Sequence, residues 1–213
     1  MAHRFLLHEP SNVVDPRVLS DMFFMRQQVF KQRLGWSVHE RHSLERDCYD
    51  LMGATYCLCV DSSDRVIGCW RLLPTNGPYL LRDVFADLLD GHEPPNDTRV
   101  WEASRFAVRN ASGSLGSRGQ INEATVGLIA ALLECGLNFG IERIVAVCDL
   151  KFERILRRSG LQTNRFGQPR QVGNTVAVAG WFDVTEDNLT CIRETNGLQD
   201  DVLFPSQTLG EAA

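Results

Sequence analysis

Three arginines stand in segments that are otherwise apolar. Arg26 falls within an apolar helical stripe, Arg71 within an apolar run, and Arg105 within a segment typical of a central strand. A guanidinium that faces a core must be paired, because an unpaired buried charge costs several kcal/mol. Arg26 could instead reach solvent from the edge of its stripe. The alternative is that it points into a polar pocket that contains carboxylates.

Three carboxylates are candidate partners. Asp47 and Asp50 are three residues apart, so one helical turn would place both on one side, although acidic loop residues are often only solvated. Glu102 shares its segment with Arg105, and strict alternation sends the two to opposite faces unless a bulge at 103–104 brings them together. Three arginines and three carboxylates in apolar surroundings predict a charged, partly buried cleft.

The cleft must be held by the elements of one α/β domain, which we expect to span residues 1–213. From about residue 190 the chain turns polar, and we expect it to pack loosely there. The order of elements predicts a mixed, twisted sheet with helices on both faces. Periodicity, caps and β-branched runs predict helices at 17–31, 80–89, 121–139 and 151–159, and strands at 54–60, 65–73, 99–108, 143–148 and 175–184.

Composition excludes several classes of protein. The chain has 22 Lys+Arg against 27 Asp+Glu, and a net charge of −5 disfavours a nucleic-acid partner. Its 7 cysteines form no CxxC pair and its 5 histidines show no helical ligand spacing, so we expect no metal site. The N-terminus lacks the apolar core of a secretory signal, and the most apolar stretch contains Glu134 and Asn138. We therefore expect a cytoplasmic protein that makes no contact with membranes.

Five blocks of sequence, in this order and spacing, resemble the acyl-homoserine lactone synthases, the autoinducer synthases of bacterial quorum sensing. Any one block is weak, but the combination is specific and runs from about residue 25 to 170. The blocks are MRQQVF at 25–30 with LGW at 34–36, ERDCYD at 45–50, GCWRLLPT at 68–75 with GPYLL at 77–81, WEASRF at 101–106, and ER at 153–154 with RSG at 158–160.

The resemblance implies a fold like that of the GNAT acyltransferases and a reaction in two steps. The amine of S-adenosylmethionine attacks an acyl thioester, and its carboxylate then displaces methylthioadenosine to close the lactone. S-adenosylmethionine is a substrate here, and no cofactor is implied. The resemblance implies Glu102 as the base that takes the proton of the amine, with Asp47 and Arg71 as further catalytic residues. It implies that S-adenosylmethionine is bound by Arg26, Phe30, Trp36, Asp50 and Arg105.

The acyl chain is expected in a slot where the strands at 99–108 and 143–148 diverge. Cys148 stands where a threonine often accompanies chains oxidised at the third carbon, which favours an unsubstituted chain. Ala103 stands where a leucine is usual, which would enlarge the pocket. Any single lining residue could equally be plain core. The expected lining is Trp101, Ala103, Phe106, Val147, Cys148, Leu150 and Phe152.

The acyl donor is expected to be an acyl carrier protein. Lys151, Arg154 and Arg158 share one face of the predicted helix at 151–159, and a basic face would steer an acidic carrier. The helix dipole also favours cations at this end of a helix, without any partner.

Two alternatives remain open. One is an acyl-CoA-dependent synthase or another GNAT-type N-acyltransferase, although the loop at 109–114 lacks the spacing of a pyrophosphate-binding turn. The other is an acidic interaction domain without activity, in which the ion pairs only set the fold. That alternative predicts no binding of S-adenosylmethionine.

Overall fold

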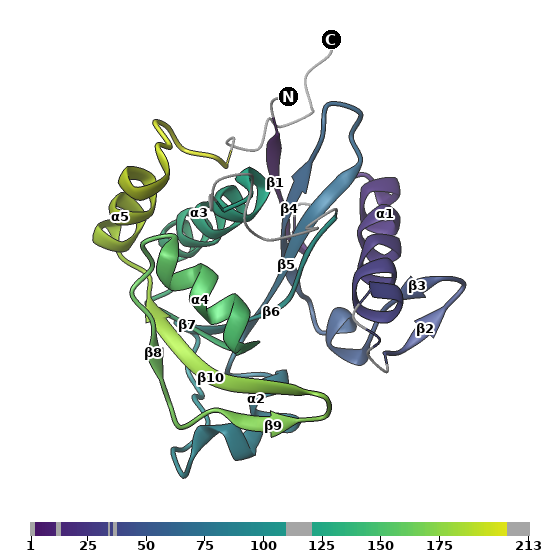
Figure 1. The fold of residues 1–213 in the computed structure, drawn as a ribbon. Coiled ribbons are helices and arrows are strands. Elements are labelled where there is room, and N and C mark those ends of the chain that lie inside the picture. The colour runs from purple at the N-terminus through teal and green to yellow at the C-terminus, as the bar shows by residue number, and fades with distance from the viewer. Residues whose placement is uncertain (1–2, 12–13, 34, 36–37, 110–120, 204–213) are drawn as a thin grey trace.

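A mixed sheet of eight strands forms the centre of the molecule (Figure 1). The computed structural model describes residues 3–11, 14–33, 35, 38–109 and 121–203. The strands run in the order β1-β4-β5-β6-β7-β10-β8, with β9 beside β10. Their bounds are β1 Arg4–His8, β4 Thr55–Val60, β5 Val66–Pro74, β6 Val100–Val108, β7 Arg143–Asp149, β8 Asn164–Arg165, β9 Arg170–Val172 and β10 Thr175–Asp183; a separate ribbon pairs β2 Glu40–Arg41 with β3 Leu44–Glu45.

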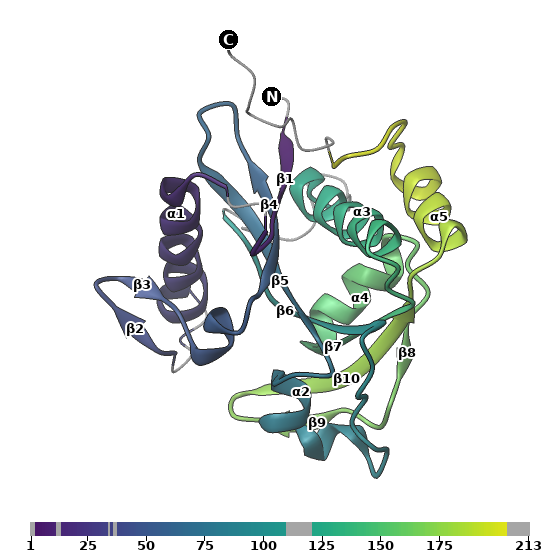
Figure 2. The ribbon, with the colours of Figure 1, turned by 180° about the vertical axis from the view of Figure 1, so that it is seen from behind.

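Helices cover both faces of the sheet, as predicted: α1 lies on one face and α3 and α4 lie on the other (Figures 1 and 2). Asp15 caps α1 by accepting a hydrogen bond from the backbone N–H of Arg17 at 2.8 Å. No helix within the described ranges is long and apolar enough to cross a membrane. The helices are α1 Pro16–Gln27, which continues as a π-helix over Gln28–Arg33, α2 Leu80–Asp83, α3 Glu123–Asn138, α4 Leu150–Arg158 and α5 Glu186–Asn196, with 3₁₀ turns at Cys48–Leu51 and Ala86–Leu89.

The apolar core has three parts, which follow from this layering. Met22 of α1 packs with Leu58 on one face of the sheet, and Leu72 packs with Leu132 of α3 on the other. Val145 belongs to a third cluster. Helix α2 and the 3₁₀ turn that follows it cover this cluster. Each face of the sheet therefore has its own apolar cover.

Two expectations about the elements are corrected. The chain after residue 190 is not loose up to Asn196, because α5 continues to that residue and buries Leu189 and Ile192. The single helix expected at 80–89 is divided into α2 and a 3₁₀ turn, because Val84 leaves the helical conformation at φ −123°.

Strand β6 contains a bulge of the kind predicted, slightly beyond 103–104. Cys69 of β5 pairs with Ala107 of β6, and Arg71 pairs with Ser104. An advance of two residues along β5 therefore corresponds to an advance of three residues along β6. Arg105 lies at the extra residue of this bulge and has φ +56°, in the left-handed region. Without this bulge Glu102 and Arg105 would point to opposite faces; with it, both charged side chains belong to the same face as α1.

Candidate active site

Arg26 extends from the last turn of α1 into a group of carboxylates. Its Nη1 and Nη2 donate to the two carboxylate oxygens of Asp50 at 2.8 and 3.0 Å, and its Nε donates to Glu45. The Arg26 side chain is fully buried, as are those of both partners. The structure therefore places Arg26 among carboxylates and not at a solvated edge of its helix.

Arg71 occupies the neighbouring position on β5. Its Nη1 donates to Asp47 at 2.5 Å and to Asp50 at 3.0 Å, and its Nε donates to Oγ of Ser104 at 3.1 Å. Its Nη2 is buried and has no hydrogen-bond partner among the described residues. A buried guanidinium nitrogen without an acceptor is suited to binding an oxygen of a ligand.

Arg105 forms the outer side of the same cluster. Its Nη2 donates to Asp47 at 2.6 Å and its Nε donates to Glu45 at 3.1 Å, and its guanidinium lies 5.7 Å from the ring centre of Phe30. The Arg105 side chain is 18% exposed and that of Asp47 is 5% exposed, whereas Arg71 has no exposed surface. The cluster therefore opens to solvent beside Arg105 and Asp47.

The short 3₁₀ turn at Cys48–Leu51 holds the two aspartates together. Asp47 caps this turn by accepting from the backbone N–H groups of Tyr49 and Asp50 at 3.0 and 3.2 Å. In return, the Asp50 carboxylate accepts from the N–H of Asp47 at 2.8 Å. This reciprocal capping fixes both carboxylates on one side of the turn, as their spacing predicts.

The charges in the cluster balance, with Arg26, Arg71 and Arg105 against Glu45, Asp47 and Asp50. Burial alone would raise the pKa of Asp50, but Arg26 and Arg71 outweigh that effect and hold this pKa below its ordinary value. Burial opposes the charge on both arginines, yet the facing carboxylates raise the pKa of each above that of a free arginine. Tyr56 donates its hydroxyl to Asp50 at 2.8 Å, and burial together with this charge raises its pKa.

Glu102 lies on β6 and contacts the start of α2. Its two carboxylate oxygens accept from the backbone N–H groups of Leu80 and Leu81 at 3.0 and 2.6 Å. Glu102 is 1% exposed, and burial raises its pKa, while these N–H groups, Arg71 and Arg105 act in the opposite direction. A carboxylate with a raised pKa is a stronger base than an ordinary glutamate.

The structure adds partners that the sequence reasoning did not select. Glu45 is fully buried and bridges Arg26 and Arg105, and its place at the start of the ERDCYD block was the available signal. Ser104 was also missed, although it lies between two of the selected positions. Trp36, predicted to cover the adenosine, lies outside the described residues. Within the described ranges, no three His, Cys, Asp or Glu side chains are grouped so that they could hold a metal ion.

Strands β6 and β7 diverge, as expected for a slot between them. Their parallel pairing joins residues 100–103 of β6 to residues 143–146 of β7 and ends there. Beyond that point β6 pairs with β5 alone and β7 with β10 alone, within the part of the chain that the structure describes. Each strand therefore leaves one edge of backbone polar groups unpaired at the point of divergence.

The predicted acyl-pocket residues are distributed over several places. Phe106 and Phe152 stack at 4.3 Å between ring centres, at the point of divergence. Trp101 stacks instead on Phe139 at 5.9 Å. Val147 faces the third core cluster and Cys148 the opposite side, because successive residues of a strand alternate. The seven residues therefore do not line one common slot.

The remaining lining residues add little to a slot. Ala103 is buried within the core against α3, and Leu150 is half-buried at the start of α4.

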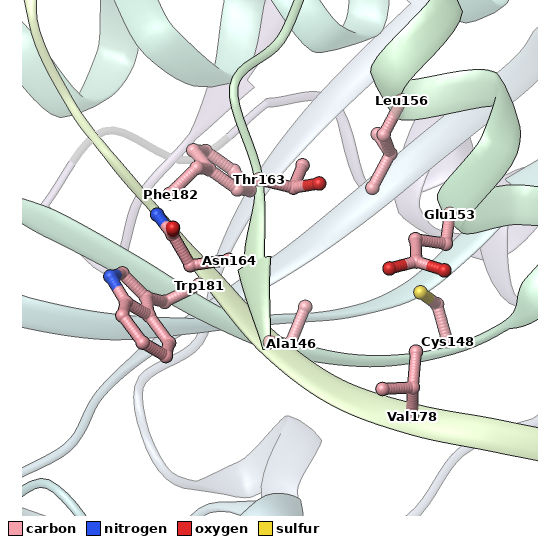
Figure 3. A pocket seen from close by; sticks show the side chains of 10 residues that line it. Ala146, Cys148, Glu153, Leu156, Thr163, Asn164, Val178, Trp181 and Phe182 are labelled. Carbon is pink, nitrogen blue, oxygen red and sulfur yellow. The ribbon is translucent and has the colours of Figure 1, made fainter. Parts of the chain in front are cut away.

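A small cavity lies between α4 and strands β7 and β10 (Figure 3). Of the predicted acyl-pocket residues, Cys148 is the one that lines it, and burial raises the pKa of its thiol to about 12. Arg165 donates to both carboxylate oxygens of Glu153 at 2.6 and 2.5 Å, which fixes this charge in the wall. The lining is Ala146, Cys148, Glu153, Leu156, Thr163, Asn164, Val178, Gly180, Trp181 and Phe182.

The basic face predicted on α4 is exposed. Lys151, Arg154 and Arg158 all lie on the solvent side of the helix, while Glu153 and Leu156 are buried beneath it. Lys151 and Arg154 form no ion pair with any described residue. These two charges are therefore available to a partner.

Comparison with known proteins decides the family. A family model described as autoinducer synthase matches residues 11–192. An acyl-homoserine-lactone synthase of Pseudomonas aeruginosa is 38% identical over 167 residues, which cover 78% of this chain and 82% of the relative. Another, from Agrobacterium fabrum, is 40% identical over 162 residues and covers 76% of this chain and 77% of the relative. The chain belongs to the autoinducer synthases. It is an acyl-homoserine-lactone synthase, an acyltransferase that makes a quorum-sensing signal.

Solved structures of autoinducer synthases share the fold. The AHL synthase LasI is 32% identical and superposes with a TM-score of 0.80 over 97% of this chain and 98% of its own. TofI, solved in a ternary complex with an inhibitor and MTA, is 32% identical with a TM-score of 0.75 over 89% of this chain and 96% of its own. A putative N-acetyltransferase from Lactobacillus plantarum, 18% identical, shares the fold alone at a TM-score of 0.59. The expected GNAT-like fold is confirmed.

Proposed function

We propose that this synthase joins the amine of S-adenosylmethionine to an acyl group carried by an acyl carrier protein and then closes the lactone. In the first step the amine nitrogen forms a bond to the acyl carbon, the carbon–sulfur bond of the thioester breaks, and the carrier thiol leaves. In the second step the carboxylate oxygen attacks the γ-carbon, and methylthioadenosine leaves with the electron pair of the sulfonium bond. S-adenosylmethionine is consumed as a substrate, so the reaction needs no cofactor.

One observation carries this proposal: arginines and carboxylates form a buried cluster in which Nη2 of Arg71 has no hydrogen-bond acceptor among the described residues. S-adenosylmethionine carries an ammonium, a sulfonium and a carboxylate, so its site needs anions and cations side by side. Asp47, at the open side of the cluster, would hold the cationic groups together with Asp50. The free Nη2 of Arg71 would bind the carboxylate, with Arg105 beside it. TofI, a relative with the same fold, was solved with MTA.

Two aromatic side chains would cover the adenosine in this proposal. Phe30 is buried beside Arg105 and comes from the π-helical turn that follows α1. Trp36 follows shortly in the sequence. An aromatic ring face near a sulfonium would also stabilise its positive charge.

Glu102 would take the proton that the amine loses on attack. The N–H groups of Leu80 and Leu81 fix the orientation of its carboxylate, and the cluster of Arg71 and Asp47 lies on the same face of the sheet. Each carboxylate oxygen keeps a second lone pair after accepting one N–H. A fixed base with a raised pKa meets the requirement for proton transfer near neutral pH.

The divergence of β6 and β7 would receive the donor. The pantetheine arm of an acyl thioester is an extended chain with two amides, and unpaired strand edges bind such chains through backbone hydrogen bonds. This arm is common to acyl carrier protein and acyl-CoA. The exposed Lys151 and Arg154 favour the acidic carrier protein. MesI, a structural relative at 27% identity, is described as CoA-dependent, so acyl-CoA is the alternative donor.

The acyl chain would lie on the α4 side of the sheet, past the rings of Phe106 and Phe152. The far end of the chain would extend toward the small cavity beside Cys148. Ala103, Val147 and Trp101 would not touch the chain, because they face the core, the other side of the sheet and Phe139 respectively.

The test of the proposal is a product balance with purified protein. The enzyme is incubated with S-adenosylmethionine and either octanoyl carrier protein or octanoyl-CoA, and the products are quantified by mass spectrometry. We expect lactone and methylthioadenosine in equal amounts, formed faster with the carrier protein. Release of methylthioadenosine without lactone would contradict the proposed sequence of steps, and faster turnover of acyl-CoA would contradict the donor.

Glu102→Gln tests the role of the base. We expect the turnover rate to fall by about 10²-fold or more, because the amide cannot accept the proton. The amide also loses one of the two N–H contacts, which costs about 1–3 kcal/mol of stability. The measurement is kcat at saturating substrates, with a thermal melt alongside. Glu142→Gln, an exposed position, serves as the control. A stability loss with kcat within threefold of wild type, roughly 0.6 kcal/mol on the barrier, would show that Glu102 only holds the turn.

A further inference from the structure

Trp70 carries a polar group that its surroundings do not satisfy. The residue lies on β5 and is 2% exposed, and its indole N–H has no hydrogen-bond acceptor among the described residues. By contrast, the indole N–H of Trp101 donates to the backbone carbonyl of Thr98 at 2.8 Å. A buried donor is expensive to leave unpaired, so natural structures rarely keep one without a reason.

The ring of Trp70 lies where the acyl group is proposed to bind. Its centre is 4.6 Å from that of Phe106 on β6 and 5.7 Å from that of Phe152 on α4. These two partners come from the two sides of the divergence between β6 and β7, and both are only half-buried. The unpaired N–H therefore belongs to an aromatic group that reaches the proposed path of the acyl chain.

Trp70 is adjacent in sequence to Arg71 but points to the other face of the sheet. Arg71 belongs to the charged cluster on the α1 face, and the ring of Trp70 packs in the core on the α3 face. The reacting carbonyl must lie beside the amine, on the charged side. An acceptor for the Trp70 N–H must then lie further along the acyl chain, yet near the reacting end, since one residue of a strand advances only about 3.3 Å.

We propose that the indole N–H of Trp70 donates to a keto or hydroxyl oxygen on the acyl chain and so selects oxygen-bearing acyl donors over unsubstituted ones. The inference rests on the proposed function, because it assumes that the acyl chain passes between β6 and β7. It reverses the preference expected from Cys148, whose buried thiol is a weak hydrogen-bonding group. A site built around a polar group discriminates strongly against a ligand that leaves that group unpaired.

The first experiment compares acyl carrier proteins that differ only at the third carbon. Unsubstituted, 3-hydroxy and 3-oxo donors of one chain length are supplied in competition, and the lactones are quantified by mass spectrometry. We expect wild type to prefer the oxygen-bearing donors by about tenfold, the scale of one hydrogen bond to a buried donor. Trp70→Phe should remove most of this preference by slowing the oxygen-bearing donors. Trp101→Phe, which removes an indole N–H that already has an acceptor, should leave the preference unchanged.

The contrary results are distinct. Equal use of all donors by wild type, or an equal loss on every donor in Trp70→Phe, would overturn the role of Trp70 and leave the proposed function standing. Absence of lactone from every donor would overturn the proposed function itself.

A second measurement needs only the wild-type protein. The indole N–H signals are followed by ¹H–¹⁵N correlation spectroscopy while a non-reactive 3-oxoacyl pantetheine thioether is added. We expect one buried indole signal, that of Trp70, to move downfield with this analogue and not with its unsubstituted counterpart. Identical spectra with the two analogues would overturn the proposal even if Trp70→Phe fails to fold.

Discussion

The buried ion pairs around Arg26 are not explained by stability. Removing a guanidinium and a carboxylate from water costs several kcal/mol for each ion, and apolar residues of similar size are often as stabilising as the pair. Arg26, Asp50 and Glu45 have no exposed side-chain surface, so each of these ions is fully removed from water. In the proposed function a charged substrate gives the reason for keeping them, since Arg26 holds Asp50 and Glu45 where Arg71 and Arg105 can orient around a ligand.

Arg26→Met tests the energetics of this arrangement. The substitution leaves two buried carboxylates without their main partner, and we expect a loss of about 3–5 kcal/mol in the free energy of unfolding. Urea unfolding measures the change. Arg17→Met, an exposed position on the same helix, should change stability by less than about 0.5 kcal/mol. A loss below about 1 kcal/mol for Arg26→Met would indicate that the pair is solvated in solution.

The pH dependence of stability follows from the lowered pKa of Asp50. A carboxyl whose pKa is lower in the folded than in the unfolded state contributes stability above its unfolded pKa, and this contribution is lost as the pH falls through the folded value. Without Arg26 the pKa of Asp50 rises. A higher folded pKa narrows the range of pH over which the unfolded state binds more protons than the native state. We therefore expect the stability of Arg26→Met to fall less than that of wild type between neutral pH and about pH 3, as measured by urea unfolding. Parallel curves for the two proteins would contradict the assignment.

Without the family resemblance, single residues could be selected only where a charge interrupts an apolar segment. Arg26 was visible for this reason, whereas the Asp47/Asp50 spacing alone was a weak signal, because acidic loop residues are often only solvated. The contacts of Glu102 were not visible, because Leu80 and Leu81 are more than twenty residues away and donate through their backbones. No local pattern encodes a bond of that kind.

At the scale of elements, β6 shows what a sequence pattern can and cannot give. Glu102 and Arg105 at a spacing of three required a bulge if both were to face one cleft, and a bulge is present. The bulge was predicted slightly too early in the strand, because the sequence does not show that Arg105 adopts the left-handed conformation. The long helix α3 and the hairpin of β4 and β5 were predictable from strong periodicity and clear turns.

Helix α5 and the short strands were missed for different reasons. Helix α5 buries only a narrow stripe of side chains, so most of its residues are polar. The sequence signals for this helix were Thr185 at its N-cap, whose side chain accepts from the N–H of Asn188, and Gly197 after its end at φ +70°. β8 and β9 are two and three residues long, and they exist only because β10 offers an edge to pair with.

Charge reversal on α4 tests whether this helix docks the carrier. Lys151→Glu with Arg154→Glu should raise the apparent Michaelis constant for acyl carrier protein and leave that for S-adenosylmethionine unchanged. Added salt should shrink the difference from wild type, because screening removes the attraction. Each reversal is also tested singly, and Arg17→Glu, exposed on α1, makes the same change in net charge as either single variant and serves as their control. If the Michaelis constant for acyl carrier protein is the same in wild type and in the doubly reversed variant, the carrier docks elsewhere.

Over the whole molecule, the sheet separates two chemical environments that the reaction must join. Helices α1 and α4 lie on opposite faces of the sheet (Figures 1 and 2). The charged cluster includes Arg26 of α1, and the stacked rings include Phe152 of α4. In the proposed function, a zwitterionic nucleophile and an apolar acyl chain approach one point from opposite sides. This arrangement is a property of the fold and could not be derived from any single block of sequence.

The central claim is that the charged cluster binds S-adenosylmethionine, and calorimetric titration of this substrate tests it most directly. Wild type is compared with Arg71→Lys, which keeps a positive charge but lacks the second terminal nitrogen of the guanidinium. We expect one binding site in wild type and an affinity at least about tenfold lower in the variant, as befits the loss of one charge-assisted hydrogen bond. Equal affinities in two folded proteins, or no binding by wild type, would contradict the claim.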